Sequence, residues 1–243
     1  MICFAAIAPH GDVDSSPELR AAMEELGRRF DAAAPDAAIV VTPHNVHVEG
    51  HFAVVTAARV GETETDTELA AAVLAALRAE GLPALAVSYG GNDPAQAEMP
   101  LDWGTEVPLR FLRAERIVVV SPARDRPLDE HVRAGRAILR ASNSLLQGGN
   151  VALIASADHG HAHDPEGPYG FDPAAAAYDA LLQEIVRSGR LGFEPLAALV
   201  EAGKADSLWQ LLVLQGALPD GLVEQLAYAA PTYYGMLVAA VAP

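Results

Sequence analysis

Seven of the eight histidines in this chain fall into three short segments. The segments are "IAPHGD" near the N-terminus, "IVVTPHNVHVEGHF" at 39–52 and "VALIASADHGHAH" at 151–163. Histidine is the commonest metal ligand among side chains, and its pKa is the one most easily tuned for proton transfer at neutral pH. The clustering therefore predicts a site that binds a metal ion, transfers protons, or does both.

His10 and His44 occur in matching contexts, "APHG" and "TPHN", in which a proline ends an apolar run and the histidine follows on a loop. Two imidazoles at the ends of adjacent strands would form a natural metal-binding pair. Either histidine alone is also explained as a surface-loop residue, but the repeated context favours metal ligation by both.

The segment "HNVHVEGH" offers further ligands beside His44. Its spacing differs from the helical H-E-x-x-H pattern of zinc proteases. The valines within it indicate an extended segment, which would place His47, Glu49 and His51 on one side. We expect at least one of these three to be a pocket or surface residue and not a ligand.

The segment "SADHGHAHDPEGPYGFDP" carries histidines at alternate positions and then a loop rich in proline and glycine. A base on a loop beside a metal is suited to proton transfer. We expect His163 to be solvent-exposed. Asp158 is expected either to orient a neighbouring imidazole or to cap the following turn.

Two further residues have ordinary structural explanations. Trp103, in "DWG" before a helix-like stretch, would most commonly be a core residue. Asp206 precedes the apolar helix-like run "SLWQLLVLQGAL", where aspartate is a favoured N-cap. Composition alone would not single out Asp206 as functional.

Apolar strand-like runs alternate with helix-like runs along the chain. The predicted strands cover 1–9, 37–44, 51–60, 84–89, 116–123, 150–160 and, at the end, 231–241. The predicted helices cover 16–35, 65–83, 127–145 and a region that starts at 172, with a short helical stretch at 108–115. Ser16 and either Thr65 or Asp66 are suited to cap the first two helices, whereas Pro35 and Gly81 are suited to end them.

This alternation predicts an α/β fold with a mainly parallel or mixed central sheet and helices on both faces. No repeat, linker or domain boundary is visible, so residues 1–243 are expected to form a single catalytic domain. Ligands of open α/β sheets bind outside the carboxyl ends of the strands. Because His10, His44 and the pair His159 and His161 each follow a predicted strand, we expect them to meet at one sheet edge.

Composition narrows the range of partners. Apolar residues make up 51% of the 243 residues, but no apolar run approaches the roughly 18 residues that span a bilayer. The N-terminus lacks the basic region of a signal peptide, and the single Cys3 excludes an internal disulfide or a cysteine-based zinc cluster. These features predict a cytoplasmic location. The net charge of −16 disfavours nucleic acids and anionic membranes as partners and is explained by solubility alone.

Seven motifs, in their order along the chain, resemble the class III extradiol ring-cleavage dioxygenases. That superfamily includes the catalytic subunit of protocatechuate 4,5-dioxygenase, the DOPA dioxygenases and the non-enzymatic Memo proteins. The motifs are "APHG", "VVTPH", "DWGTEVPL", "SADHGH", "GPYGFDP" with "AAYD", "DSLWQLLVLQGAL" and "TYYGMLVAA". Each is short, but their order over nearly the whole chain makes the match fairly specific for the superfamily, though not for a substrate.

The resemblance implies an α/β fold with the site at one sheet edge. It implies a non-haem Fe(II) ion held by two histidines and one carboxylate, with open positions for substrate and O₂; Zn or Mn are alternatives. His10 and His44 match the two histidine ligands. Asp206 stands where the family usually has glutamate, and it is one methylene shorter, with Glu201 as the alternative carboxylate.

The resemblance also implies the roles of pocket residues. His161 matches the family's acid/base histidine, and His159 is an additional imidazole beside it. Trp103 replaces a substrate-binding histidine found in many relatives, which implies a different substrate or activity. His47 and His51 would then lie near the pocket wall.

The implied reaction is the opening of a small aromatic diol, a catechol or an aminophenol, by O₂. The resemblance further implies self-association, and some relatives need a small accessory subunit. Two other functions share the same histidine-rich strand ends: a zinc-dependent hydrolase, in which the metal activates water, and a Memo-like binding module. The presence of His10, His44 and His161 together favours the enzyme over a scaffold.

Overall fold

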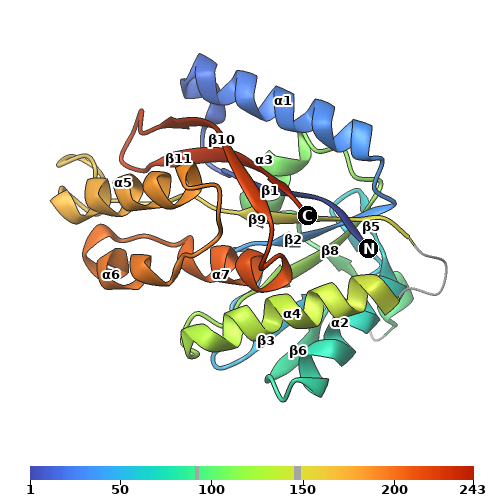
Figure 1. Cartoon of the computed structure of the whole chain (residues 1–243). Coiled ribbons are helices and arrows are strands. Elements are labelled where there is room, and N and C mark those ends of the chain that lie inside the picture. Colours follow the sequence, from blue (N-terminus) through green and yellow to red (C-terminus); the bar gives the residue numbers. More distant parts are fainter. Residues whose placement is uncertain (91–92, 145–148) are drawn as a thin grey trace.

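A computed structural model describes residues 1–90, 93–144 and 149–243, and Figure 1 shows its ribbon. In these ranges the chain forms one eleven-stranded sheet. The strands are β1 Ile2–Ala8, β2 Ala37–Val41, β3 Phe52–Val55, β4 Arg59–Val60, β5 Thr63–Thr65, β6 Ala84–Val87, β7 Glu98–Met99, β8 Arg116–Ser121, β9 Val151–Ser156, β10 Leu222–Ala229 and β11 Met236–Ala242.

Helices cover both faces of this sheet. The α-helices are α1 Pro17–Ala33, α2 Thr67–Ala79, α3 Trp103–Leu109, α4 Leu128–Ser144, α5 Pro173–Arg187, α6 Val200–Gly203 and α7 Leu208–Ala217. Short 3₁₀ helices cover Val13–Ser15, Pro94–Gln96 and Glu194–Leu199.

The sheet is mixed, with a parallel centre. The main strand order is β10-β11-β1-β9-β2-β8-β5-β4-β7, and β3 and β6 branch from β8. Strands β1, β9, β2 and β8 run parallel to one another, whereas β11 is antiparallel to β1 and β10 is antiparallel to β11. This arrangement confirms the predicted α/β class with a mixed sheet.

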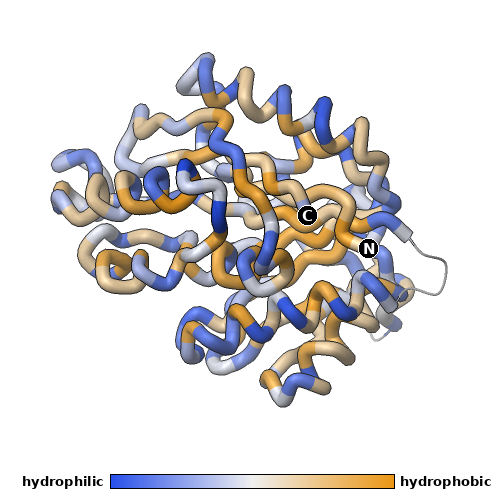
Figure 2. Tube along the Cα trace, viewed as in Figure 1, coloured by the Kyte–Doolittle hydropathy of each residue, from blue (hydrophilic) through white to orange (hydrophobic). Residues whose placement is uncertain are grey.

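The central strands are buried on both faces, which explains their continuous apolar sequences. In β2, "AAIVV", every residue is buried. Ile39 and Val41 contribute to one core, whereas Ala38 and Val40 contribute to the other, because successive side chains of a strand point to opposite faces. Figure 2 shows the apolar residues concentrated in these central strands, while the outer helices carry polar residues as well.

Each face has its own set of helices (Figure 1). Helices α1 and α3 share the core on one face, and α2, α4, α5 and α7 share the core on the other. Helices α4 and α7 approach closely through two glycines. A Cβ at Gly135 would overlap the carbonyl oxygen of Val213, and a Cβ at Gly216 would overlap that of Val132.

The residues predicted to cap the first two helices do so in the structure. Ser16 accepts a hydrogen bond from the Leu19 amide, and Pro17 is the first residue of α1. Helix α1 ends at Ala33 because Ala34 adopts a left-handed conformation. Asp66, and not Thr65, caps α2 through the Leu69 amide.

Several element predictions were wrong. The region after α5 was predicted to be helical down to 231, but it contains β10, which pairs with β11. The predicted strand 51–60 is divided into β3 and β4, and the helical stretch predicted at 108–115 instead begins at Trp103, where Asp102 caps it. Residue 145, the last of the predicted helix 127–145, lies outside the described residues.

In the part of the chain that the structure describes, no helix is both long enough and apolar enough to cross a membrane.

Candidate metal centre

The parallel central strands end side by side, and the predicted histidines follow their ends. Ala8 of β1 lies opposite Ser156 of β9, and the ends of β2 and β8 lie in register beside them. His10, His44 and the segment 157–163 come directly after these positions. The topology therefore brings three remote parts of the sequence to one edge of the sheet.

His10 is buried, with 3% of its surface exposed, and its tautomer follows from its hydrogen bonds. The Ser156 hydroxyl has one hydrogen, which it donates to the Gly104 carbonyl at 2.5 Å. In its 3.0 Å bond with His10 Nδ1, the same hydroxyl must therefore accept. Nδ1 carries the ring proton, so the lone pair is on Nε2.

His44 presents its ring to His10. The two Nε2 atoms are 3.1 Å apart, and the rings meet edge to face. The backbone of His44 is held on both sides, because its amide donates to Thr42 Oγ1 and its carbonyl accepts from the Ser121 hydroxyl. The next residue, Asn45, has a left-handed conformation with φ 74° and donates to Asp102.

Asp206 provides a carboxylate beside the two imidazoles. Its Oδ2 is 3.9 Å from His44 Nε2, and one ligand atom from each of His10, His44 and Asp206 lies within 4.8 Å of the others. Its Oδ1 is buried and has no hydrogen-bond partner among the described residues. Ser207 occupies the cap position of α7, so Asp206 does not serve as the helix cap.

Gln210 holds Asp206 in this position. Its buried side-chain amide donates to the Asp206 carbonyl at 3.0 Å and to the Ser156 carbonyl at 3.2 Å. The first turn of α7 is thereby tied to the end of β9. Glu201, the alternative carboxylate, lies on α6 and is exposed; it lines the cavity but does not belong to the three-residue group.

The donor set fits one divalent metal ion. Two nitrogens bound at right angles with metal–nitrogen bonds of about 2.1 Å would be about 3 Å apart, close to the observed separation. Burial lowers the pKa of His10 to about 4, and burial together with repulsion by His10 lowers the pKa of His44 to about 4. Both imidazoles are neutral at pH 7, so their lone pairs are available to a metal.

A cavity of about 600 Å³ opens beside this group. It is lined by His10, Gly11, His44, Trp103, Arg124, Asp158, His161, Tyr169, Val200, Glu201, Lys204, Ala205, Asp206, Trp209, Tyr233 and Tyr234. Tyrosines and tryptophans form much of this wall, so a flat ring would find stacking surfaces here.

His161 lies among three of the tyrosines. Its ring centre is 6.1 Å from that of Tyr169, 6.0 Å from that of Tyr233 and 5.6 Å from that of Tyr234. Its Nδ1 donates to the His159 carbonyl at 2.6 Å, which leaves the lone pair on Nε2. A half-buried imidazole with this tautomer is suited to accept a proton from a ligand in the cavity.

Asp158 is buried beside His10 and takes neither of its two predicted roles, because its hydrogen bond goes to a backbone amide and not to an imidazole or to the turn that follows it. Its Oδ1 accepts a hydrogen bond from the His10 amide at 3.1 Å, so it positions the His10 loop. Its Oδ2 is 3.6 Å from His10 Nε2. Burial raises the pKa of this carboxyl to about 7.

Trp103 lines the cavity mouth, contrary to the core position that its residue type would favour. Its side chain is 57% exposed, and its ring centre is 4.5 Å from that of His44. The neighbouring Gly104 allows α3 to start this close, because a Cβ there would overlap Thr42 Oγ1.

His47 and His51 do not line the cavity in the described part of the chain. The extended segment predicted for them is absent there, because Val48 pairs with His51 across a tight turn. His51 Nδ1 instead bonds to the Glu49 carbonyl at 2.8 Å. The predicted location of both histidines at the pocket wall was therefore wrong.

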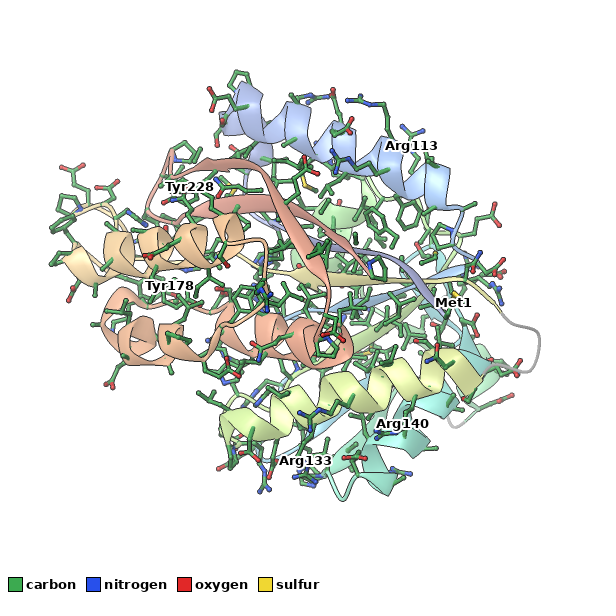
Figure 3. The ribbon with its side chains drawn as sticks, in the orientation of Figure 1. Met1, Arg113, Arg133, Arg140, Tyr178 and Tyr228 are labelled. Carbon is green, nitrogen blue, oxygen red and sulfur yellow. The ribbon has the colours of Figure 1, made fainter. Side chains whose placement is uncertain are left out.

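His159 is fully buried behind the cavity wall. Its Nδ1 bonds to Ser207 Oγ at 2.9 Å, and Ser207 also bonds to the Tyr178 hydroxyl at 3.0 Å. Tyr178, labelled in Figure 3, comes from α5. Burial lowers the pKa of His159 to about 4. The geometry thus places His159 as a connection between the loop after β9, α5 and α7, whereas the sequence predicted a catalytic imidazole in the cavity beside His161.

His163 is also paired inside the protein, which corrects the prediction that it is solvent-exposed. Its Nε2 is 2.8 Å from Asp179 Oδ2. The same buried carboxylate accepts bonds from the Tyr228 hydroxyl and the Gly160 amide, each at 2.8 Å. Tyr228, labelled in Figure 3, belongs to β10, so Asp179 ties the histidine loop to α5 and β10.

Several cavity residues were not singled out from the sequence. Tyr169, Tyr233 and Tyr234 lie in the motifs "GPYGFDP" and "TYYGMLVAA", which did not indicate that their side chains line the cavity. Arg124 follows the end of β8, just as His10 and His44 follow the ends of β1 and β2. This position after a central strand could have indicated from the sequence that Arg124 lies at the site. Trp209 lies three residues after Asp206, one helical turn further along α7.

Comparison with known proteins identifies the family of this chain. The family model described as the catalytic LigB subunit of aromatic ring-opening dioxygenase matches residues 9–240. The chain belongs to this family. The match confirms the resemblance found in the sequence motifs. In this LigB-family chain, the candidate metal site is formed by His10, His44 and Asp206.

Two individual proteins are similar to this LigB-family chain. "Protein CA_C1420" of Clostridium acetobutylicum is 25% identical over 185 residues, which cover 69% of this chain and 39% of that protein. The chain therefore spans about two fifths of that relative's length. The crystal structure of the uncharacterized protein JW3007 from Escherichia coli K12 has a TM-score of 0.60 and 16% identity, covering 98% of this chain and 99% of that one, which shows a shared fold.

Proposed function

We propose that this protein is an Fe(II)-dependent extradiol dioxygenase that opens the ring of a small aromatic diol or aminophenol with O₂. The observation that carries the proposal is the convergence of His10, His44 and Asp206 within 4.8 Å at the edge of an aromatic-lined cavity that also contains His161. Membership of the LigB family supports the reaction type.

Two imidazole nitrogens and one carboxylate are the donor set of non-haem Fe(II) oxygenases, and the bound ion would supply adjacent open positions for the diol and O₂. His10 and His44 offer neutral lone pairs, and Asp206 offers an Oδ1 that is unpartnered among the described residues. Ser156 holds His10 in the required tautomer. These residues bind and orient; they need not move during turnover.

His161 is the proposed acid and base. Its Nε2 lone pair would accept the proton of a substrate hydroxyl, and the Nδ1 hydrogen bond to the His159 carbonyl would stabilise the resulting cation. The proton would later return from Nε2 to an oxygen of the opening ring. The same nitrogen, Nε2 of His161, would thus accept and return the proton, so the proton would not leave the cavity.

The aromatic walls would bind the substrate ring. Trp103 lies against His44 on one side, and Tyr233 and Tyr234 lie against His161 on the other. A diol placed between these walls would have its hydroxyls directed toward the three candidate ligands. Such placement converts an encounter of separate reactants into a reaction of held groups.

The first test measures metal content and O₂ uptake after anaerobic purification and addition of Fe(II). We expect near-stoichiometric iron, oxygen consumption with at least one member of a panel of catechols and aminophenols, and a yellow ring-opened product. Bound zinc with hydrolysis of an ester or amide would favour the hydrolase. Absence of turnover over the whole panel would favour a Memo-like binding module.

Variants separate the proposed ligands from the proposed base. Asp206→Asn should lose most bound iron, whereas Glu201→Gln, a matched change in the same cavity, should retain it. His161→Gln should keep iron and reduce turnover by roughly a hundredfold or more, the range typical of a general base. Equal iron content in the Asp206 and Glu201 variants would contradict the assigned carboxylate.

A further inference from the structure

Two basic side chains line the cavity of this strongly acidic protein. The chain has 16 basic and 32 acidic residues, yet Arg124 and Lys204 both contribute to the cavity wall. Within the described ranges, neither has a carboxylate at ion-pair distance, whereas surface arginines such as Arg20 and Arg29 are paired. Positive charge is therefore available to a ligand at this site.

Arg124 is held beside the candidate metal centre. It follows the end of β8, the strand next to the one that leads to His44. Its guanidinium carbon is 4.2 Å from the ring centre of Trp209, one helical turn beyond Asp206. The carboxylate of the adjacent Asp125 accepts the Gly50 amide at 2.7 Å, so it is directed to another partner.

The stacked arrangement favours binding of an anion. A guanidinium placed over an aromatic ring keeps N–H groups free at its edge, where they can bind both oxygens of a carboxylate. Restriction by Trp209 also lowers the entropy lost when such a ligand binds. Lys204, exposed at the end of α6, lines the same cavity and would add a second positive charge there.

We infer that Arg124, stacked on Trp209, is a specificity-determining residue that selects diols carrying an acidic group on the ring or on a short side chain. This inference rests on the proposed function for the position of the diol. The stacking contact with Trp209 would by itself give Arg124 a purely structural role, and that role would not discriminate between charged and neutral ligands.

The test measures anaerobic binding to the metal-loaded protein by calorimetry. The probes are 3,4-dihydroxybenzoate, 3,4-dihydroxyphenylacetate and 3,4-dihydroxyphenylpropanoate. Each is compared with its neutral amide and with the corresponding acid that lacks the two hydroxyls. We expect at least one acid to bind roughly ten to a hundred times more tightly than its amide, as for a charge-assisted contact. Arg124→Gln should abolish this preference and Arg124→Lys should retain part of it.

Arg136→Gln is the matched control, because Arg136 is an exposed arginine on α4, outside the residues that line the cavity. It changes the net charge equally and should preserve the preference, and metal content should be the same in all variants. Acids and amides that bind equally in the native protein, or a preference that survives Arg124→Gln, would overturn the inference.

The acids without hydroxyls test the proposed function separately. If they bind as tightly as the diols, the diol contact is refuted while the acid preference can still be present. If diols are required but acids and amides are equivalent, the proposed function stands and the role of Arg124 is refuted. No binding by any probe would contradict both.

Discussion

The hydroxyl of Ser156 fixes which nitrogen of His10 can bind a metal ion. It accepts from Nδ1 because its only hydrogen is donated to the Gly104 carbonyl. Such outer partners of a metal ligand orient the ring and set its tautomer. A single hydroxyl thereby connects β9, the start of α3 and the candidate metal centre.

Removal of this hydroxyl should weaken metal binding without removing a ligand. We expect Ser156→Ala to lower metal affinity by roughly ten- to a hundredfold, the usual cost of losing an outer partner. Competition titration with a chromophoric chelator measures it. Ser144→Ala is the control, because Ser144 Oγ bonds locally to the Ala141 carbonyl at the end of α4. An unchanged affinity in Ser156→Ala would contradict the tautomer argument.

The lowered pKa values of His10 and His44 predict how metal binding responds to acid. Protons compete for a histidine ligand only when the pH approaches its pKa, and here both pKa values are about 4. Apparent affinity should therefore stay high as the pH falls from 7.5 to 5.5. Asp158, with a pKa of about 7, gains a proton in this interval. This removes negative charge near His10, so we expect a small decrease in metal affinity.

We expect less than about a tenfold loss of Zn(II) affinity between pH 7.5 and 5.5, measured by calorimetry. Two ligands with the ordinary histidine pKa of about 6.5 would instead lose roughly a hundredfold. A loss of the larger size would show that the two imidazoles are not protected by burial.

At the residue scale, the sequence predicts best where strand ends determine position. His10 and His44 meet because the strand order brings the ends of β1 and β2 to one edge of the sheet, whereas Asp206 could be proposed only from its place in a family motif. His163 differs because its partner, Asp179, lies in a helix that no local pattern connects to it. His47 and His51 differ because the turn between Val48 and His51 breaks the alternation of side chains.

Helix packing decides where Asp206 lies. Asp206 lies two residues before α7, and α7 packs on α4 through Gly135 and Gly216, where any Cβ would overlap the opposite backbone. The two helices can therefore lie this close only because both positions are glycines, which have no Cβ.

An alanine at Gly135 should force the two helices apart. We expect Gly135→Ala to lower the free energy of unfolding by about 3 kcal/mol, the upper part of the range for overpacking, and to reduce metal affinity as well. Chemical denaturation measures the first effect. Gly192→Ala is the control, since no atom lies within 4 Å of the position that a Cβ would take there, and it should change stability by less than about 1 kcal/mol. Equal effects would contradict the packing argument.

At the element scale, strands with continuous apolar sequences were the most predictable. Strand β10 was missed because "LVEQLAYA" follows long helical stretches and its pairing with β11 is a tertiary contact. Helix α3 was misplaced because Asp102 caps it, and the capping signal lies before the apolar turn that was used.

The whole molecule is organised around one continuous sheet that includes both the N-terminal β1 and the C-terminal β11. These strands are adjacent, with Ala5 opposite Val241. Helices cover both faces of the sheet (Figure 1). The expectation of a single domain was drawn from a sequence without a visible linker and stays a prediction, and the pairing of β1 with β11 was not readable from the sequence.

We expect the protein to unfold on heating in one cooperative transition, as measured by calorimetry. A metal ion at about a hundred times its dissociation constant should stabilise the native protein by about 2.7 kcal/mol and raise the midpoint, because it binds only the folded site. The Asp206→Asn variant should show a much smaller rise. Two separate transitions, with only one sensitive to metal, would contradict a single unit built around this sheet.

We propose that both atoms of O₂ enter an opened aromatic ring at the site formed by His10, His44, Asp206 and His161. The most direct measurement is mass spectrometry of the product made under ¹⁸O₂, with immediate borohydride reduction to prevent exchange of the aldehyde oxygen. We expect two labelled oxygen atoms in a ring-opened product, and roughly a hundredfold less of that product from the His161→Gln sample on the same time scale. A product labelled only from water would contradict it.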